Sequence, residues 1–154
     1  LIQILNQEKK YNFKEMIGLM NKIDSKTFFG ESTAYKASVS SGRFNTSDDY
    51  KLVRNISRLY EHFFVRLDLN GNMLDKIVIN FSDDFSSNFN KARFNQTNID
   101  TLQLKNYFFS NDFHNALLNV YDMQNNYYLK RLSETRNQLI AIKDLLNNQQ
   151  QILK

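Results

Sequence analysis

The chain has 154 residues, and its 20 basic and 16 acidic side chains give a formal net charge of +4, which is too small and too dispersed to indicate a nucleic-acid partner. It contains no cysteine, which excludes disulfides, thiolate metal sites and cysteine nucleophiles. With no proline and only four glycines, the sequence favours a few long helices within a single domain over residues 1–154 rather than a many-turned sandwich or barrel.

The first part of the chain predicts two helices. Apolar residues at helical spacing support a helix over residues 1–23, although Gly18 and the polar residues 6–10 weaken it. The residues that carry this spacing are Ile2, Leu5, Phe13, Ile17 and Met20. A corner is expected at Phe28-Phe29-Gly30, followed by a short helix over residues 31–41.

Ser40-Ser41-Gly42 invites two interpretations. Gly42 stands where the residue after a helix C-terminus needs a positive φ, and Phe44 stands where the accompanying hydrophobic contact falls. Residues 46–49, Thr-Ser-Asp-Asp, then supply N-cap candidates for the next helix. A serine nucleophile is the alternative, but no G-x-S-x-G elbow surrounds these serines. The stretch is therefore predicted to be a corner, with Tyr35 and Phe44 as buried partners across it.

A long helix is predicted over residues 48–86. Its apolar positions step by three or four, apart from one interval of seven around Gly71. These positions are Leu52, Ile56, Leu59, Phe63, Leu67, Leu74, Val78, Phe81 and Phe85. A hairpin over residues 65–81 is the alternative, because Asn-Gly is a strong turn signal and the residues that follow are β-branched.

The C-terminal part predicts a second long helix. Residues 86–101 lack periodicity and are expected to form a loop, residues 102–109 form a short apolar segment, and Ser110 starts a helix over residues 111–148. An unbroken 3-4 repeat in this helix predicts the seam of an antiparallel bundle or coiled coil. The seam consists of Leu118, Tyr121, Asn125, Tyr128, Leu132, Thr135, Leu139, Ile142 and Leu146.

The two long helices have nearly equal lengths, and two such helices bury each other best side by side. The expected fold is therefore all-α, an elongated up-down helical bundle with two long antiparallel helices. The two shorter helices would cover the remaining apolar face.

Few residues suggest chemistry. His62 and His114 belong to no metal-binding spacing, and the acidic pairs at residues 48–49 and 83–84 suit helix caps or solvated surface better than acid–base catalysis. No phosphate-binding or dinucleotide-binding glycine motif occurs. We therefore expect no catalytic residue, no metal and no cofactor.

Aromatic residues are in excess, with 13 phenylalanines and eight tyrosines. A Phe/Tyr-rich core is the first interpretation, and a groove lined by tyrosines is the second. For that groove the candidate ligand-binding residues are Arg54, Arg58, Tyr60, Tyr121 and Tyr128. The arginines would bind an anionic group, or else form an ordinary solvated basic face.

Residues 32–45 and the helix after them resemble an uncharacterised family of bacterial single-pass membrane proteins. The shared pattern is a Ser-Thr-x-Tyr step, a Ser-Ser-Gly corner and a helix that ends in Leu-Tyr. The matching residues are Ser32, Thr33, Tyr35, Ser40, Ser41, Gly42, Leu59 and Tyr60. The resemblance implies a transmembrane anchor upstream of Leu1, with this domain outside the cytoplasm. It implies no activity.

The expected function is that of a non-enzymatic, membrane-tethered, extracytoplasmic (periplasmic) helical domain that binds a protein partner or associates with itself. A ligand-binding sensor bundle is the alternative from a different class.

Overall fold

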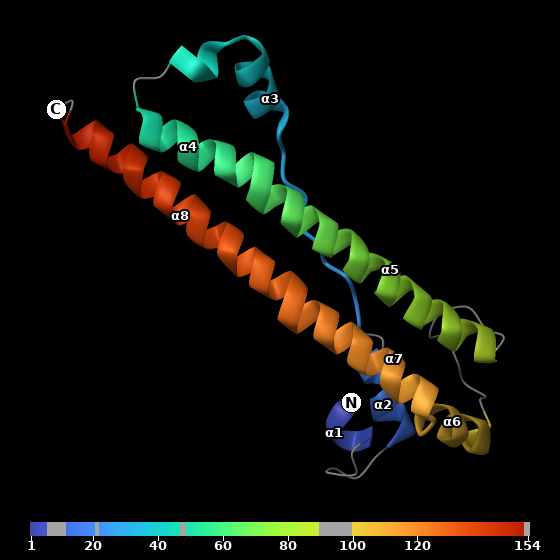
Figure 1. Ribbon diagram of the computed structural model, residues 1–154. Helices are drawn as coiled ribbons and strands as arrows, with labels where there is room; N and C mark the ends of the chain where they lie inside the picture. Colours follow the sequence, from blue (N-terminus) through green and yellow to red (C-terminus); the bar gives the residue numbers. More distant parts are fainter. Residues whose placement is uncertain (6–11, 21, 47–48, 90–99, 153–154) are drawn as a thin grey trace. The chain divides into compact units, whose positions relative to one another are not determined.

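The computed structural model describes residues 1–5, 12–20, 22–46, 49–89 and 100–152, and within these ranges the chain is helical and contains no strand (Figure 1). The all-α class predicted from the sequence is confirmed. The helices, with η marking 3-10 and π turns, are α1 (Ile2–Leu5), α2 (Phe13–Met20), α3 (Thr33–Ser40), η1 (Arg43–Thr46), α4 (Tyr50–Arg58), η2 (Leu59–Phe63), α5 (Phe64–Phe89), α6 (Thr101–Phe108), α7 (Asn111–Asp122), η3 (Met123–Tyr128) and α8 (Leu129–Ile152).

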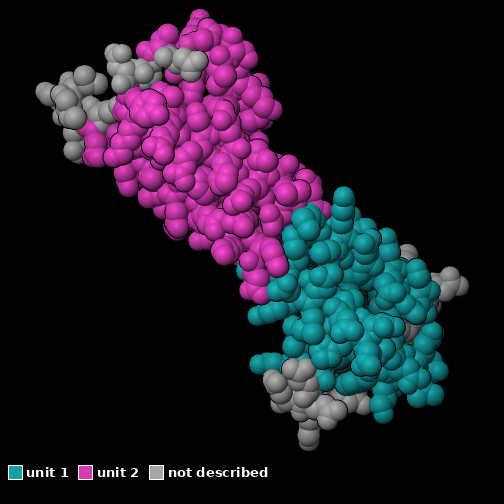
Figure 2. Space-filling view, in the orientation of Figure 1, with its two compact units in different colours: residues 1–26, 73–125 teal, residues 27–72, 126–154 magenta. Residues whose placement is uncertain are grey.

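The chain forms two compact units (Figure 2). Unit 1 consists of residues 1–26 and 73–125, and unit 2 of residues 27–72 and 126–154. Each unit therefore combines an N-terminal segment with parts of both long helical stretches, so that neither is a continuous piece of sequence.

Unit 1 is built around phenylalanines. Phe108 and Phe113 are fully buried, with ring centroids 5.1 Å apart, and Phe81 and Phe85 of α5 contact them at 5.5 Å and 6.2 Å respectively. Met16 and Met20 of α2 are also buried, among the other apolar residues of this core. The predicted aromatic core is confirmed for these phenylalanines, whose large apolar area dominates the burial.

In unit 2, α4 and η2 pack against α8 (Figure 1). The side-chain amide of Gln138 donates to the carbonyl oxygen of Asn55 at 2.9 Å and to its side-chain oxygen at 3.0 Å. Farther along, Gly71 lies near Tyr128. From the first contact to the second, residue numbers rise along the α4–α5 helix and fall along the η3–α8 helix. The two helices are therefore antiparallel here, as predicted.

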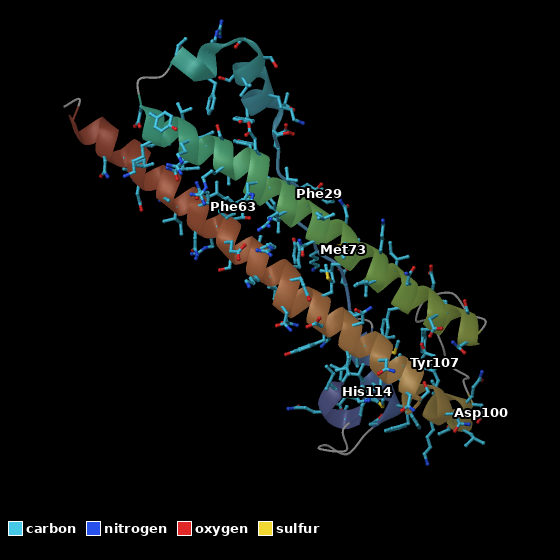
Figure 3. The ribbon with its side chains drawn as sticks, viewed as in Figure 1. Phe29, Phe63, Met73, Asp100, Tyr107 and His114 are labelled. Carbon is cyan, nitrogen blue, oxygen red and sulfur yellow. The ribbon has the colours of Figure 1, made fainter. Side chains whose placement is uncertain are left out.

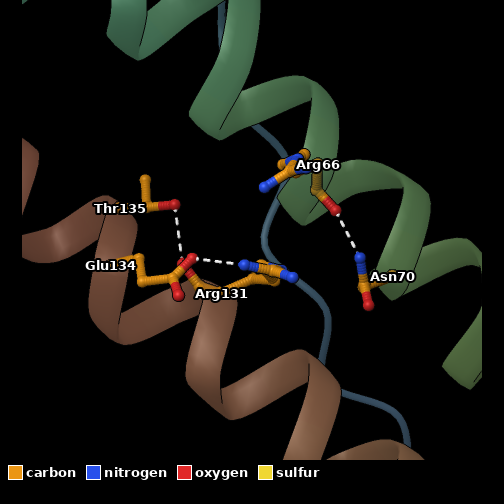
Figure 4. Close-up of polar contacts among 5 residues, drawn as sticks. All are labelled: Arg66, Asn70, Arg131, Glu134 and Thr135. Carbon is orange, nitrogen blue, oxygen red and sulfur yellow. Dashed lines mark hydrogen bonds and ion pairs between the residues drawn. The ribbon is translucent and has the colours of Figure 1, made fainter.

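On the α5 and α8 segments of unit 2, the polar contacts are mostly local (Figure 4). Arg131 forms an ion pair with Glu134 at 2.7 Å, and the hydroxyl of Thr135 donates to the carbonyl oxygen of Arg131. The side chain of Asn70 donates to the carbonyl oxygen of Arg66. A partly exposed pair three residues apart adds only a few tenths of a kcal/mol, so burial rather than charge pairing holds these helices together.

Side-chain caps begin α4 and α7 where the sequence predicted them, and α6 where it predicted none. The carboxylate of Asp49 accepts from the backbone N–H of Leu52 at 2.9 Å, and Ser110 accepts from that of Phe113 at 3.1 Å. Residues 47–48 lie outside the described residues. Asp100 caps α6 in the same way. Each cap satisfies a backbone donor that a helix start otherwise leaves unpaired.

The Ser-Ser-Gly stretch is a corner. Gly42 has a φ of +74°, and its N–H donates to the carbonyl oxygen of Val39. Ser41, the residue after α3, is exposed, and its hydroxyl donates to the carbonyl oxygen of Ser38 in α3. The rings of Tyr35 and Phe44 meet edge to face at 5.2 Å across the corner. Tyr35 of α3 and Phe44 of η1 are both half-buried rather than buried, and α3 buries none of its residues fully.

Several predicted element boundaries change. The hairpin alternative is wrong, because residues 65–81 are helical throughout and Gly71 is buried inside α5. The loop predicted from residue 86 is wrong up to Phe89, where α5 ends, and residues 90–99 lie outside the described residues. In the predicted helix over residues 1–23, α1 and α2 are the helical parts, and the predicted end at residue 23 is wrong, because α2 ends at Met20 and residues 22–23 are not helical. Residues 6–11 and 21 lie outside the described residues.

The predicted seam of the last helix needs a correction at η3. It is confirmed at Tyr128, the last residue of η3, and after η3 at Thr135 and Ile142, all of which are buried. Its other positions are wrong or only partly buried: Leu118, Tyr121, Asn125, Leu139 and Leu146 are exposed, and Leu132 is half-buried.

The π turn explains the error before η3. A seven-residue count back from Tyr128 reaches Tyr121, whereas Val120 is the buried residue. Because a π turn holds one residue more than the heptad count assumes, the buried stripe shifts by one position across η3. After η3, Gln138 rather than Leu139 is the buried residue, and its side chain forms the hydrogen bond to Asn55 of α4.

Candidate functional site

A cleft of about 540 Å³ opens in unit 2 between the segment before α3, α3 itself and the start of α5. Four aromatic rings and several polar groups line it. The lining residues are Phe29, Gly30, Ser32, Tyr35, Lys36, Tyr60, Glu61, Phe64, Val65 and Asp68. Its volume lies within the range of about 300–1,000 Å³ that is usual for ligand pockets.

One wall is the extended segment around Phe28-Phe29-Gly30, which passes beside α5 (Figure 3 labels Phe29). The backbone N–H of Phe28 donates to the hydroxyl of Tyr128 at 2.6 Å, which attaches the segment to the C-terminal helix. Gly30 lies so close to Phe64 that a Cβ atom would sit 2.8 Å from its ring. Only glycine fits without displacing that ring.

The opposite wall is a series of ring contacts. Tyr35 stacks on Tyr60 with centroids 4.4 Å apart and planes 4° from parallel. Tyr60 meets Phe64 edge to face at 5.2 Å, and Phe64 in turn contacts Phe28 at 5.7 Å. Offset stacked and edge-to-face pairs are the favoured aromatic geometries. Two segments distant in sequence, residues 28–35 and 60–64, are thereby held around one cleft.

The π turn η2 supplies Tyr60 and Glu61 to this cleft. In a π turn the extra residue changes the direction of the side chains that follow, and such turns are frequent at functional sites. The location of the turn therefore supports this cleft as the candidate site.

The polar groups of the cleft include a tyrosine–carboxylate pair. The hydroxyl of Tyr35 donates to Oε1 of Glu61 at 2.5 Å. Burial of the ring raises the pKa of Tyr35, and the neighbouring Glu61 carboxylate raises it further, because both disfavour the phenolate. Tyr35 is therefore neutral at physiological pH and acts as a hydrogen-bond donor.

The structure separates the ligand-binding residues that the sequence predicted. Tyr60 lines the cleft, whereas Arg54 and Arg58 are exposed on α4 and do not line it. The guanidinium of Arg58 lies 5.8 Å from the ring centroid of Phe63. Tyr128 is buried and holds the Phe28 segment, and Tyr121 belongs to unit 1.

Sequence reasoning overlooked Phe29, Glu61 and Asp68 as parts of a site. Phe29 had a signal, since two phenylalanines before a glycine predicted a corner against which something packs. The carboxylates had none, because they look like ordinary exposed residues of a long helix and only the tertiary contacts of α3 bring them to a cleft.

Unit 1 has a second cleft, of about 430 Å³, with mainly polar walls that include Asp84, Asn88, Gln103 and Tyr107 (Tyr107 is labelled in Figure 3). The hydroxyl of Tyr107 donates to Oδ2 of Asp84 at 2.8 Å, and Gln103 donates to the carbonyl oxygen of Asn88. Burial, and then the Asp84 carboxylate, raise the pKa of Tyr107. The hydrogen bonds join the lining residues to one another, which is typical of packing.

No group of three or more potential metal ligands occurs among the described residues. His62 and His114 lie in different units, and His62 is exposed beside the ring of Phe63.

In the described parts of the chain, no helix combines the length and the apolar character needed to cross a bilayer.

Comparison with known proteins gives a family. The model of a family of unknown function, DUF6090, matches residues 2–123, which is most of the chain. The chain belongs to this family. The match covers all the described elements from α1 to α7, and with them the cleft residues of unit 2. No curated protein and no solved structure matches the chain.

Proposed function

We propose that this chain is a non-enzymatic protein-interaction domain, tethered to a bacterial membrane by an upstream helix and located outside the cytoplasm. The interaction surface is the aromatic cleft of unit 2. The partner is another protein or a second copy of the chain. The resemblance at residues 32–45 supports the membrane topology, and the cleft supports the binding role.

The observation that carries the binding role is the exposed apolar rim of the cleft. Phe29 is 72% exposed and Val65 is 59% exposed, and both line the cleft. Leu69, one turn farther along α5, is 58% exposed. Scattered apolar residues on a surface are ordinary, but apolar residues gathered at the mouth of a cleft are typical of interaction sites.

Photocrosslinking in the host cell tests the binding role. We expect p-benzoylphenylalanine in place of Phe29 to form a defined adduct with a partner or a second copy. The matched control carries it in place of Leu139, which is exposed on α8 outside the cleft. Light scattering over a concentration series then separates self-association from binding to another protein. A strictly monomeric chain that gives no adduct at position 29 would contradict the binding role.

Fractionation of the full-length protein tests the topology. We expect the protein in the membrane fraction, with this domain digested by protease added to spheroplasts. Recovery in the cytosol would contradict the tether and leave the binding role to be judged by the crosslinking result.

A ligand-binding sensor is the second candidate, and the volume of the cleft favours it. A small molecule at 100 times its dissociation constant would stabilise the fold by about 2.7 kcal/mol, which thermal unfolding detects readily. A rise in melting temperature with one member of a metabolite panel, lost in Tyr60→Ala, would favour this function. A flat response across the panel would exclude the compounds tested.

A further inference from the structure

The aromatic cleft of unit 2 is locally acidic, although the whole chain carries a net charge of +4. Its lining contains two carboxylates, Glu61 and Asp68, and one ammonium group, Lys36. Both carboxylates line the cleft, Glu61 from η2 and Asp68 from α5, and so lie on the same side of the η2–α5 helix. The local charge therefore favours a cationic group in the cleft.

Both carboxylates can accept further hydrogen bonds. A carboxylate offers about four acceptor positions, and Tyr35 occupies one of those of Glu61. Asp68 is exposed and has no hydrogen bond or ion pair with the residues that the structure describes. Two partly unused acceptors thus stand beside aromatic rings.

Aromatic rings and carboxylates together distinguish between cations. A guanidinium group is planar, stacks on aromatic faces and gives paired N–H donors to a carboxylate, whereas an ammonium group is compact and strongly hydrated. Phe29 offers a largely exposed ring at the mouth of the cleft. The combination matches a guanidinium better than an ammonium.

We propose that the cleft binds an arginine side chain of a partner protein, stacked against the aromatic wall and paired with Glu61 and Asp68. The exposed Val65 and Leu69 would contact apolar residues that flank this arginine. This inference rests on the proposed binding role and adds the chemistry that the cleft recognises.

A peptide titration tests the inference. The probe is the pentapeptide acetyl-Leu-Ser-Arg-Ser-Leu-amide, added to the isotope-labelled chain while amide NMR shifts are followed at Gly30, Lys36 and Glu61. The matched peptide carries citrulline, which has the shape of arginine without its charge. We expect saturable shifts with the arginine peptide and at least about tenfold weaker binding of the citrulline peptide.

Variants locate the binding groups. Glu61→Gln keeps an acceptor for Tyr35 but loses the charge, and Asp68→Asn does the same for the second carboxylate. We expect each to weaken binding of the arginine peptide about tenfold, while Asp84→Asn in unit 1 leaves it unchanged.

Three results would overturn the inference. These are equal affinity for the two peptides, no saturable shift with either, or chain self-association that Glu61→Gln abolishes, which would assign the arginine to a second copy. If crosslinking from position 29 still captures a partner while the peptides show no preference, the binding role stands and only the arginine inference fails.

Discussion

At the scale of single residues, two glycines fix the shape of the region around the cleft for different reasons. Gly42 is needed for its backbone, since its φ of +74° is costly for any residue with a Cβ. Gly30 is needed for space, since a Cβ would press on the ring of Phe64. The first requirement is local and could be predicted from the sequence, whereas the second depends on a contact across 34 positions of the chain and could not.

Replacing Gly42 with alanine should lower the free energy of unfolding by about 1 kcal/mol, because alanine is strained at positive φ. Urea unfolding followed by circular dichroism measures the change. Ser41→Ala is the control, and we expect almost no effect, since the Ser41 hydroxyl is exposed and bonds only to Ser38 of α3. An unchanged stability of the Gly42 variant would contradict the role of this residue as a helix stop.

Tyr128→Phe should remove the acceptor of the Phe28 N–H and leave that donor unpaired beside a buried ring. Phe28 is 42% exposed and its bond to Tyr128 is only part-buried, so water replaces part of the lost acceptor and the cost should be about 0.5–1.5 kcal/mol. Hydrogen exchange is the direct measurement, and the Phe28 amide should lose its protection. Tyr127→Phe changes a neighbouring tyrosine that is half exposed and should have no such effect. Slow exchange at Phe28 in the Tyr128 variant would disprove the bond.

At the scale of helices, the sequence correctly predicted that the elements are helices. It predicted the buried residues of the middle helix better than those of the last helix. The stripe of the middle helix is confirmed at Leu59, Leu67, Leu74 and Phe85, because hydrophobic spacing reports directly which face is buried. The stripe of the last helix is displaced before η3, because a π turn has no sequence signature in this spacing. One extra residue in a turn, which the hydrophobic spacing does not reveal, rotates the predicted buried face by about 100°.

The candidate site could be predicted only in part, for a related reason. Tyr60 was identified because it is an aromatic residue within a helix whose spacing was clear. Arg54 and Arg58 were grouped with it on sequence proximity, but residues two and six positions away on a helix point in other directions. The carboxylates of the cleft form part of a site only because α3 packs beside them, and no local sequence pattern determines that packing.

The hydrogen bonds between Gln138 and Asn55 should contribute to the pairing of α4 with α8. Gln138 is 8% exposed, so its truncation to alanine should cost about 1–3 kcal/mol. A double-mutant cycle with Asn55→Ala should give a coupling energy of about 1 kcal/mol for the side-chain bond. Ser133→Ala on the exposed side of α8 is the control. Additive effects of the two substitutions would show that the side chains do not interact.

At the scale of the whole molecule, each compact unit has one tyrosine that donates to a carboxylate at the edge of a cleft. These pairs are Tyr35–Glu61 in unit 2 and Tyr107–Asp84 in unit 1. In both, burial is the first cause of a raised tyrosine pKa and the carboxylate adds to it. The stability of both units should therefore depend on alkaline pH in the same way, although their cores consist of different residues.

The sign of that dependence follows from proton linkage. A tyrosine in the unfolded chain loses its proton near pH 10, whereas the folded chain holds the proton to higher pH. The contribution of each pair is therefore fully present below about pH 10 and is lost as the pH rises through the raised pKa. We expect the free energy of unfolding to fall steeply above about pH 10. Urea titrations at a series of alkaline pH values measure this slope.

Substitutions separate the contributions of the two units to this slope. Tyr107→Phe removes the titrating group of unit 1 and should flatten the dependence, and Tyr35→Phe should do the same for unit 2. Asp84→Asn removes only the charge beside Tyr107, so its slope should lie between those of the parent chain and the Tyr107 variant, because burial still disfavours the phenolate. A slope that Tyr107→Phe leaves unchanged would show that this tyrosine ionises alike in the folded and unfolded chains, and that the pair with Asp84 does not hold its proton.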